Sequence, residues 1–335
     1  MKFEFFIGID VSKSELDFAV IQGKVLLSHQ EIVNTPAGIS CFLKTLSKIK
    51  GFKLDKALFC MEHTGIYTAH LLSGLHKRNA NLCLEAATQI RNSLGNIRGK
   101  NDKIDAIRIA EYACKNSEYA TLWAPKRLVI QQLSLLATTR SRLIKAKKML
   151  TVAFSEAEAF LPKKNVKQNC ELCSKTVKAM ELDLQKIDKA IDQIIASDQE
   201  LTRLFELVTS VSGIGTVTAT QIIITTNEFK DIKDPKKYAC YSGVAPFTKE
   251  SGIFKGKAHV SHMANKKVKT LLHMSAIVAI QHNKDLKEFY QRKVELEKKN
   301  KMSVINAVRN KLILRIFACV RLNKKYEQNY QKLVA

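Results

Sequence analysis

Four acidic residues in the first third of the sequence have the types and the spacing of a metal-assisted site. Asp10 ends one apolar run and Glu62 ends another, so both carboxylates are expected at one edge of a mixed sheet. Asp102 and Asp105 lie three residues apart in a predicted helix and therefore share one face of it. Carboxylates gathered this closely repel one another unless cations neutralise them, and Mg²⁺ prefers such oxygen ligands. The four acids predict a site for Mg²⁺, with Mn²⁺ as an alternative ion, that can bind and cleave a phosphodiester.

Each acid taken alone has a simpler explanation, because carboxylates are common on solvated surfaces and at helix caps. Four of them at matching positions along the predicted elements are more typical of a nuclease with the ribonuclease H-like arrangement. Positive charge surrounds the acids in the sequence as well, at Arg91, Arg98, Lys100 and Lys103. Basic side chains at these positions suit a phosphate backbone.

A serine in a basic, glycine-containing loop is the candidate nucleophile. The segment 241–252 reads YSGVAPFTKESG, and a lysine-rich stretch follows it as far as Lys269. Attack of the Ser251 hydroxyl on a phosphodiester leaves a phosphoserine link. Ser242 and Ser261 are local competitors, and loop serines usually form turns. Because a serine hydroxyl needs a base or a metal to activate it, Ser251 is expected to meet the four acids in space, within one chain or between chains.

Two glycines in the segment 209–219, TSVSGIGTVTA, indicate a helix-hairpin-helix element. Gly213 and Gly215 let the backbone approach a ligand closely, and main-chain N–H groups at the following helix start can hold a phosphate without reading bases. A Gly-x-Gly is also common in ordinary tight turns, and no strand or longer glycine pattern accompanies it to indicate a dinucleotide fold. Nucleic-acid contacts are further expected from Arg98, Lys100, Lys103, Lys255, Lys257, Lys266, Lys267 and Lys269.

The composition agrees with a nucleic-acid partner. Among 335 residues, 55 Lys and Arg stand against 31 Asp and Glu, a formal net charge of +24. An excess of that size predicts binding to a polyanion with release of its counterions. Hydrophobic residues make up 46% of the chain, and no apolar run approaches the roughly 20 residues that span a bilayer. The N-terminus lacks the pattern of a signal peptide, and the eight cysteines lack disulfide-framework spacing, so we expect a cytoplasmic protein without a membrane partner.

The elements that must position the acids alternate between strands and helices in the first 125 residues. Apolar or alternating runs predict strands over Phe3–Asp10, Leu16–Ile21, Lys24–Val33, Lys56–Met61 and Asn81–Glu85. Helices are predicted from a Thr35-Pro36 start to about Lys50, over Tyr67–Arg78 and over Asn101–Ala113. The apolar side of the last helix is expected at Ile104, Ile107, Ile109 and Ala110. The order predicts an α/β domain with a mixed five-stranded sheet.

Strand signals end near Trp123, and the remainder is predicted to be mainly helical. Leu128–Phe160 is rich in helix formers, and a break follows at Leu161–Asn165. Beyond it, apolar residues recur in the a/d steps of a coiled coil at Val177, Met180, Leu184, Ile187, Ile191 and Ile194. Two long helices could pair there, within one chain or between chains. The sequence predicts three domains: 1–125 with the acids, 126–204 as a helical coiled-coil region, and 205–335 as a helical domain with the helix-hairpin-helix element and Ser251.

Several motifs, in order along nearly the whole chain, carry a resemblance to a known family. They are GIDVSK from Gly8, MEHTG from Met61, NDKIDA from Asn101, SGIGTVTA from Ser212, YSGVAP from Tyr241, Ser251-Gly252 and the stretch Ser261–Lys269. The sequence resembles the insertion-sequence transposases with a DEDD acidic tetrad, which are serine recombinases guided by a bridge RNA. The combination is far more specific than any one motif.

The resemblance implies an N-terminal RuvC-like nuclease domain of the RNase H fold, a coiled-coil middle and a helical transposase domain. It implies that Asp10, Glu62, Asp102 and Asp105 form the metal-binding tetrad and that Ser251 is the nucleophile. It also implies composite sites shared between protomers of a homodimer or homotetramer. Its partners would be double-stranded DNA, at the element ends and the target, and a structured non-coding guide RNA that pairs with both. The implied activity is cutting and rejoining of DNA strands by transesterification through a phosphoserine intermediate.

Two alternatives stay open from the residues alone. A hydrolytic, structure-selective nuclease of the Holliday-junction resolvase kind would use water as its nucleophile, and Ser251 would only form a turn. It predicts that Ser251→Ala keeps cleavage. A non-enzymatic nucleic-acid-binding scaffold would explain the composition, but a net charge of +24 does not require four aligned acids.

Overall fold

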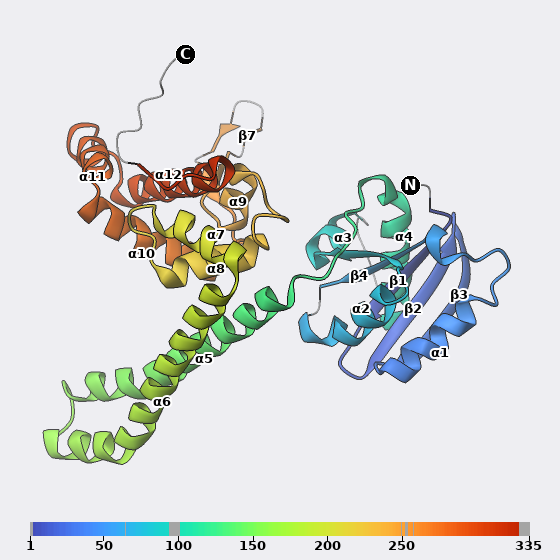
Figure 1. Cartoon of the computed structure of the whole chain (residues 1–335), viewed down its shortest axis with the longest axis horizontal. Coiled ribbons are helices and arrows are strands. Elements are labelled where there is room, and N and C mark those ends of the chain that lie inside the picture. Colours follow the sequence, from blue (N-terminus) through green and yellow to red (C-terminus); the bar gives the residue numbers. More distant parts are fainter. Residues whose placement is uncertain are drawn as a thin grey trace. The chain divides into compact units, whose positions relative to one another are not determined.

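The computed structural model describes residues 3–63, 65–93, 101–248, 250–251, 254–256 and 258–327. The chain divides into two compact units, residues 1–125 and residues 126–335. The first unit is an α/β arrangement and the second is mostly helical (Figure 1). No helix in the described ranges is both long enough and apolar enough to cross a membrane. Three predicted site residues, Arg98, Lys100 and Lys257, lie outside the described residues.

Five strands form one mixed sheet in the first unit. β1 (Phe5–Val11), β2 (Glu15–Gln22) and β3 (Val25–Val33) form an antiparallel meander, which β4 (Ala57–Glu62) and β5 (Asn81–Glu85) extend. The strand order is β3-β2-β1-β4-β5, with β4 parallel to both β1 and β5. The prediction of a mixed five-stranded sheet is confirmed. Apolar runs produce β1 and β4, which are buried along nearly their whole length, as central strands are.

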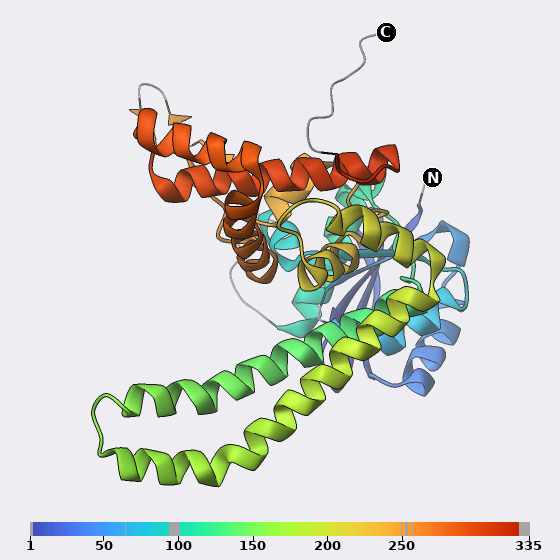
Figure 2. The ribbon, with the colours of Figure 1, turned by 60° about the vertical axis from the view of Figure 1, so that its left-hand side comes forward.

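Helices cover both faces of this sheet. α1 (Pro36–Leu46) and α2 (Ala69–His76) pack on one face, and α4 (Asp102–Lys115) packs on the other (Figure 2). Because side chains alternate along a strand, the odd-numbered residues of β1 enter the first core and the even-numbered residues face α4. Thr35 caps α1 by accepting a hydrogen bond from the Gly38 N–H.

Two details of the first unit differ from the prediction. The sequence predicts no helix where α3 (Ala87–Ser93) forms, because its segment ATQIRNS is short and polar and buries only Ile90. The predicted apolar side of α4 is confirmed at Ile107, which packs against the core between α4 and the sheet, and at the buried Ile109 and Ala110, but Ile104 is not part of that core. Small residues prevail on that side because α4 lies very close to the sheet, and the buried set is Ala106, Ile109, Ala110, Tyr112 and Ala113.

α5 (Leu128–Ala157) and α6 (Lys163–Ser197) form a long antiparallel pair in the second unit (Figures 1 and 2). Two ion pairs, each 2.6 Å long, link the helices: Arg140 Nε with Asp188 Oδ1, and Lys147 Nζ with Glu181 Oε1. The predicted a/d positions of α6 are buried or partly buried, whereas most positions between them are exposed. The two long helices of one chain therefore pair with each other. α6 begins inside the stretch that the sequence predicts as a break.

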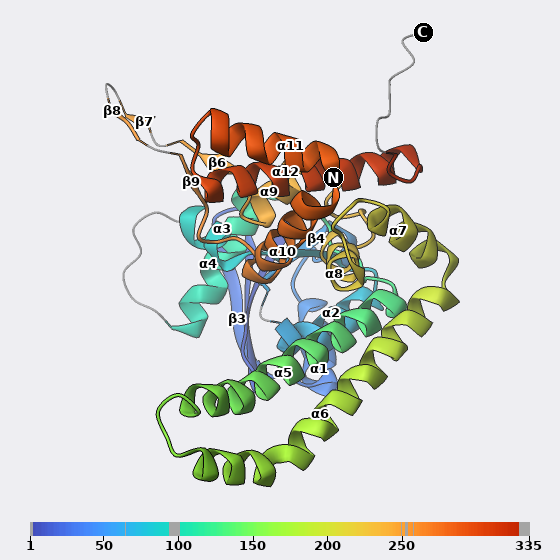
Figure 3. The same cartoon turned by 90° about the vertical axis from the view of Figure 1, so that its left-hand side faces the viewer.

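The remaining helices of the second unit pack around one core. They are α7 (Gln199–Thr209), α8 (Thr216–Thr226), α9 (Pro235–Tyr241), α10 (Lys266–His282), α11 (Lys284–Gln291) and α12 (Lys301–Leu322), with a π-helical turn at Arg292–Leu296. Between α9 and α10 the chain forms two short strand pairs (Figure 3). They are β6 (Pro246–Phe247) with β9 (His259–Val260), and β7 (Glu250–Ser251) with β8 (Phe254–Lys255).

An ion-pair cluster ties the start of α5 to the rest of the second unit. Arg127 donates from Nη1 and Nη2 to the Asp198 carboxylate at 2.8 and 3.0 Å, and it also pairs with Glu228, whose side chain is fully buried. Asn227, Glu228 and Phe229 have φ of 49, 58 and 60°, a left-handed conformation that costs free energy in residues other than glycine. The ion pairs of Glu228 and the burial of Phe229 hold this strained turn in place.

Candidate functional site

The four predicted acids lie on the α4 side of the first unit. Asp10 and Glu62 are at the carboxyl-terminal ends of β1 and β4, which are parallel neighbours in the centre of the sheet. Even-numbered residues of both strands face α4, as their apolar neighbours in the core there show. Asp102 and Asp105 occupy the first turn of α4. The fold therefore directs two acids from the sheet and two from a helix to one face.

Gly8 sets the distance between β1 and α4. A Cβ atom at this position would lie 2.1 Å from the Ala106 carbonyl oxygen and 2.2 Å from the Ala110 nitrogen. Both are backbone atoms, so no side-chain rotation relieves the clash, and only glycine allows this contact. Gly8 precedes Asp10 by two residues, and Ala106 directly follows Asp105. The same close contact thus brings the acids of the strand and of the helix together.

The start of α4 suits negative charge. Asn101 caps the helix by accepting a hydrogen bond from the Ile104 N–H at 2.7 Å. Asp102 and Asp105 lie in the first turn, where the positive end of the helix dipole favours carboxylates. Arg108 donates from Nη1 to Asp105 Oδ1 at 3.0 Å. These contacts stabilise the two carboxylates at the start of α4, although Asp10 and Glu62 of the sheet carry charge of the same sign.

The pKa of Asp10 is raised, and the three other acids contribute to the rise. Burial raises this pKa most, and a hydrogen bond from the Val11 N–H at 2.9 Å opposes the rise. The negative charges of Asp102, Asp105 and Glu62 raise the pKa further. The result is a pKa of about 6, against 3.8 for an ordinary aspartate. The structure thus brings the other three acids within electrostatic reach of Asp10.

The donor atoms of this cluster suit a divalent ion such as Mg²⁺ or Mn²⁺. All are carboxylate oxygens, the ligands that hard cations prefer, and a cation would relieve the repulsion that raises the pKa of Asp10. Among the described residues, no three carboxylate, imidazole or thiol side chains already stand close enough together to hold a metal. A metal ion held by these four residues would need their carboxylates to lie closer together than they do here.

Ser251, the candidate nucleophile, belongs to the second unit and occupies an exposed position in β7. Ser242 is fully buried and donates a hydrogen bond to the Ala239 carbonyl at 3.2 Å, so it cannot reach DNA. The Ser261 hydroxyl accepts a hydrogen bond from the Met263 N–H at 3.2 Å, which is the turn-forming role of many loop serines. Of the three serines, Ser251 is the most exposed.

The predicted helix-hairpin-helix segment connects α7 to α8. Gly213 has a φ of +88°, and a Cβ there would lie 2.5 Å from the Ser275 carbonyl oxygen of α10, so packing requires glycine. Gly215 is the N-cap of α8, and a Cβ there would meet nothing within 4 Å. Gly213 therefore serves the packing of two helices, whereas Gly215 leaves open space in front of α8.

The predicted basic contacts occur in both units. Lys103 is exposed in the first turn of α4. Lys266 and Lys267 are exposed in the first turn of α10, and Lys269 is partly buried one turn further on. Lys255 belongs to β8, in the hairpin that carries Ser251. These lysines thus lie near the ends of elements and not along one continuous helix face.

Sequence patterns do not indicate Arg309, a cation of α12 that is only 5% exposed. Its Nη2 lies 2.6 Å from His273 Nδ1, its Nη1 donates to Asn306 Oδ1 at 3.4 Å, and its Nε has no hydrogen-bond partner in the described part of the chain. It lines a cavity of about 890 Å³ together with His259 and Lys269. One arginine in a basic chain carries no sequence signal, and only its burial distinguishes it.

Two family models match the chain. The model described as the Transposase IS116/IS110/IS902 family matches residues 205–291, and a model for the DEDD transposase of IS110 matches residues 7–155. The chain belongs to the IS116/IS110/IS902 family of transposases. The resemblance predicted from the sequence is thereby confirmed, and the protein is a DNA strand-transferring enzyme. The four acids lie within the match over residues 7–155, and Ser251 lies within the match over residues 205–291.

Individual proteins similar to this transposase include a pilin gene-inverting protein and a protein of an insertion element. The pilin gene-inverting protein of Moraxella bovis is 24% identical over 330 residues, which are 96% of this chain and 98% of that protein. The insertion element IS116 uncharacterized 44.8 kDa protein of Streptomyces clavuligerus is 25% identical over 183 residues, 53% of this chain and 44% of that protein. Among solved structures, Thermus thermophilus RuvC in complex with a Holliday junction substrate is 12% identical with a TM-score of 0.27, covering 35% of this chain and 97% of that chain.

Proposed function

We propose that this transposase cuts and rejoins DNA by transesterification, with Ser251 as nucleophile and the four acids as the metal-binding site. The convergence of Asp10, Glu62, Asp102 and Asp105 carries the proposal, because like charges gathered on one face need a cation. A divalent cation at a phosphodiester is the chemistry that strand transfer requires. The exposure of Ser251 supports its role, since a nucleophile must reach DNA and one competing serine is buried.

Each group has its own task in this proposal. When bound, Mg²⁺ or Mn²⁺ supplies polarisation of the phosphate and stabilises the charge that develops on it. Asp10 and Glu62 orient the site from the rigid ends of two central strands. Asp102 or Asp105, at the start of α4, accepts the proton of the Ser251 hydroxyl.

The serine step conserves the energy of the broken bond. Ser251 Oγ forms a bond to phosphorus, the bond from phosphorus to a deoxyribose oxygen breaks, and that oxygen takes up a proton. One phosphodiester is exchanged for another, so no external energy source is needed. A hydroxyl of a second DNA strand can then attack the phosphoserine and release Ser251 with the strands joined.

The wider organisation follows the same proposal. We assign residues 1–125 to a RuvC-like nuclease domain, 126–204 to a coiled-coil region and 205–335 to a transposase domain with a helix-hairpin-helix element. Because the acids and Ser251 belong to different units, a composite site between protomers of a homodimer or homotetramer would let them meet. A guide RNA would supply sequence specificity by base pairing. The net charge of +24 and the relative's inversion of a pilin gene support double-stranded DNA as substrate.

A trapping assay tests the mechanism. Purified protein is mixed with Mg²⁺, DNA of its element ends and RNA from the flanking region, and a denaturing gel resolves covalent protein–DNA adducts. We expect an adduct with the wild type and with Ser261→Ala, and none with Ser251→Ala, with Asp10→Asn or after EDTA. An adduct that persists in Ser251→Ala but disappears in Ser261→Ala would move the nucleophile to Ser261.

The same gel distinguishes the serine mechanism from hydrolysis by water. A structure-selective nuclease of the Holliday-junction resolvase kind would yield free cleaved DNA without an adduct, and Ser251→Ala would still cleave. That result would overturn the serine mechanism and leave the acids as the catalytic groups. Membership of a transposase family favours strand transfer over this alternative.

A further inference from the structure

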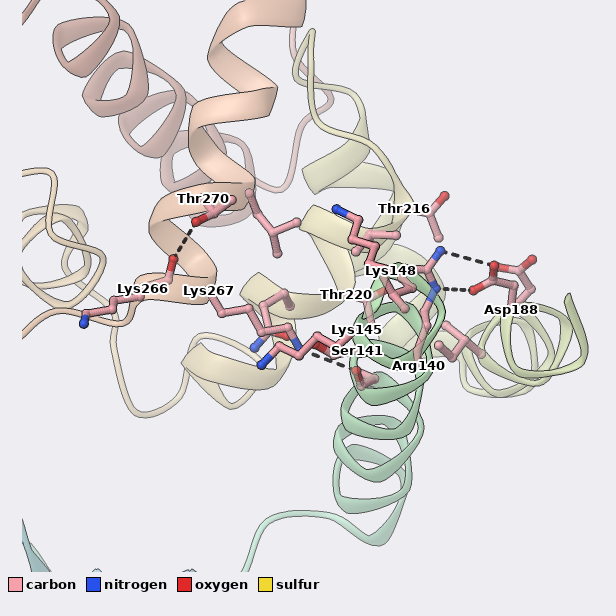
Figure 4. Close-up of a pocket in the computed structure, with 17 residues that line it drawn as sticks. Arg140, Ser141, Lys145, Lys148, Asp188, Thr216, Thr220, Lys266, Lys267 and Thr270 are labelled. Atoms are coloured by element: carbon pink, nitrogen blue, oxygen red, sulfur yellow. Dashed lines mark hydrogen bonds and ion pairs between the residues drawn. The ribbon is translucent and has the colours of Figure 1, made fainter. Parts of the chain in front are cut away.

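The second unit contains a basic cavity that none of the catalytic steps above uses. It has a volume of about 810 Å³ and is lined by residues of α5, α6, α8 and α10 (Figure 4). Its basic side chains are Arg140, Lys145, Lys148, Lys266 and Lys267. Two carboxylates, Asp188 and Asp192, also line it. The excess of positive charge indicates an anionic ligand.

Cations within this cavity repel one another. Partial burial lowers the pKa of Lys267 most, and the charges of Arg140 and Lys145 lower it further. Lys145 and Lys267 extend toward the same space from α5 and α10 (Figure 4). Arg140 pairs with Asp188, whereas Lys145, Lys148 and Lys267 form no ion pair with any described residue. A bound anion would offset this repulsion.

The start of α8 and a buried hydroxyl belong to the same cavity. Thr216 and Val217 of the first turn line it, and Gly215 has no side chain to cap the free N–H groups there. Thr220, one turn further on, also lines it. This residue is 4% exposed, and its hydroxyl has no hydrogen-bond partner in the described part of the chain. A buried hydroxyl without a partner is unfavourable unless a ligand supplies one.

We propose that this cavity binds a backbone phosphate of a nucleic acid, held by the α8 N-terminus, Lys145, Lys267 and the Thr220 hydroxyl. Helix N-termini hold phosphate well because their free N–H groups and the helix dipole both favour an anion. The ligand is the phosphodiester common to DNA and RNA, so this contact reads no base. The inference rests on the proposed function, because it takes the nucleic acid of strand transfer as its partner.

Fluorescence-anisotropy titrations of the full chain in EDTA test the proposal, because chelation prevents cleavage. Labelled duplex DNA and single-stranded RNA of equal length are titrated at several salt concentrations. Lys145→Ala/Lys148→Ala removes two exposed lysines of the cavity. The control Lys175→Ala/Lys178→Ala removes two exposed lysines with the same spacing on α6, outside the cavity lining. Both variants lose the same charge and no ion pair, so both should fold.

We expect the cavity variant to bind about tenfold more weakly near 0.1 M salt. The slope of log K against log[salt] should fall in magnitude by about one, as for the loss of one phosphate contact. The control should stay within about twofold of the wild type. If the cavity variant loses more affinity for one polymer than for the other, that polymer occupies the cavity. Equal losses of affinity for DNA and RNA would support a contact to the phosphodiester that both share. Equal losses in cavity variant and control would show that only total charge matters and would overturn the proposal.

A double-mutant cycle tests whether two helices hold the same phosphate. If they do, Lys145→Ala/Lys267→Ala loses less affinity than the product of the two single losses, and independent losses would contradict the shared site. Thr220→Val keeps the side-chain shape and removes the hydroxyl. It should weaken binding at unchanged salt slope, with a Tm no lower than that of the wild type, and unchanged affinity would contradict the Thr220 contact. A wild-type protein that binds neither polymer would instead contradict the proposed function itself.

Discussion

Two clusters of like charge, one in each unit, have opposite signs and opposite pKa shifts. In the first unit, burial and the three neighbouring acids raise the pKa of Asp10 to about 6. In the second, burial and two neighbouring cations lower the pKa of Lys267. Each shift favours the neutral form of the group, so each cluster costs folding free energy that an ion of opposite sign would offset. A phosphodiester with a divalent cation provides both kinds of ion.

The supports of the two clusters differ as well. The acids are held at the ends of buried central strands and on a helix fixed against Gly8. Lys145 and Lys267 lie on helix surfaces, and their ammonium groups are at the ends of flexible side chains. A metal ion needs ligands held within a narrow geometry, whereas a lysine tolerates movement of the phosphate that it contacts. The comparison therefore supports the two proposals, with the chemistry at the acidic cluster and retention of the polymer at the basic one.

Gly8→Ala should disrupt the acidic cluster and give the largest effect of the proposed substitutions. The new Cβ would lie 2.1 Å from the backbone oxygen of Ala106, so α4 must move away from β1 and take Asp105 with it. We expect the first unit to lose about 3 kcal/mol of unfolding free energy and the enzyme to lose its covalent adduct. Urea unfolding followed by the fluorescence of Trp123, the one tryptophan of the chain, reports on this unit.

Gly74→Ala is the matched control in the same unit. A Cβ at Gly74, inside α2, meets only the Ile39 side chain, whose Cγ2 would be 3.3 Å away. Alanine is also the better helix former, so the change in unfolding free energy should stay below about 1 kcal/mol. If Gly8→Ala were as stable and as active as Gly74→Ala, the close contact of α4 with β1 would not be what assembles the acids.

The pH dependence of stability, compared between the wild type and Asp10→Asn, tests the raised pKa in the acidic cluster. The pKa of Asp10 in the folded chain, about 6, lies above its ordinary value of 3.8, so the folded state keeps the proton longer. The stability that this proton contributes is complete below about pH 4 and is lost as the pH rises through 6. Relative to Asp10→Asn, the wild type should therefore lose at most about 3 kcal/mol of unfolding free energy between pH 4 and pH 7.

Urea titrations of both proteins in EDTA, read from Trp123, measure this difference. Mg²⁺ added at pH 7 should narrow it, because a cation offsets the repulsion among the acids. A difference that stays constant from pH 4 to pH 7 would show that neither burial nor the acidic neighbours raise the pKa of Asp10.

Sequence patterns locate the acids but not the contact that assembles them. Asp10 and Glu62 could be placed at strand ends because an apolar run that stops at an acid marks where a buried strand reaches solvent. The role of Gly8 is invisible at that level, since a glycine in a strand fits a bulge equally well. The same missing contact explains the error at Ile104. The approach of α4 selects small residues, which hydrophobic periodicity ranks below isoleucine.

In the second unit, candidate site residues can be found from the sequence, but which of them lie together in space cannot. Ser242 and Ser251 stand in similar glycine-containing surroundings, and only burial separates them. The basic cavity combines side chains of α5, α8 and α10. No periodicity links these segments, because their proximity depends on tertiary packing. Lys266 and Lys267 could therefore be predicted as nucleic-acid contacts, whereas the α5 cations that share their cavity could not.

Lys267→Met tests the lowered pKa in the basic cluster and should change stability least among these substitutions. Methionine keeps an apolar stem and removes the charge. The pKa of Lys267 in the folded chain lies below its ordinary value of 10.5, so folding favours the neutral amine. Its contribution to stability is complete above pH 10.5 and is lost as the pH falls through the lowered pKa. Relative to Lys267→Met, the wild type should thus gain unfolding free energy as the pH rises toward 10.5.

Circular dichroism at 222 nm during urea unfolding measures this gain, because the second unit is mostly helical. Lys175→Met, on the exposed surface of α6, is the control for a lysine away from the cavity. Inorganic phosphate at neutral pH should stabilise the wild type more than Lys267→Met, because only the complete cluster gathers enough positive charge to hold the anion. If the two proteins kept a constant difference at every pH and responded equally to phosphate, Lys267 would not be under repulsion from its neighbours, and the parallel between the two clusters would fail.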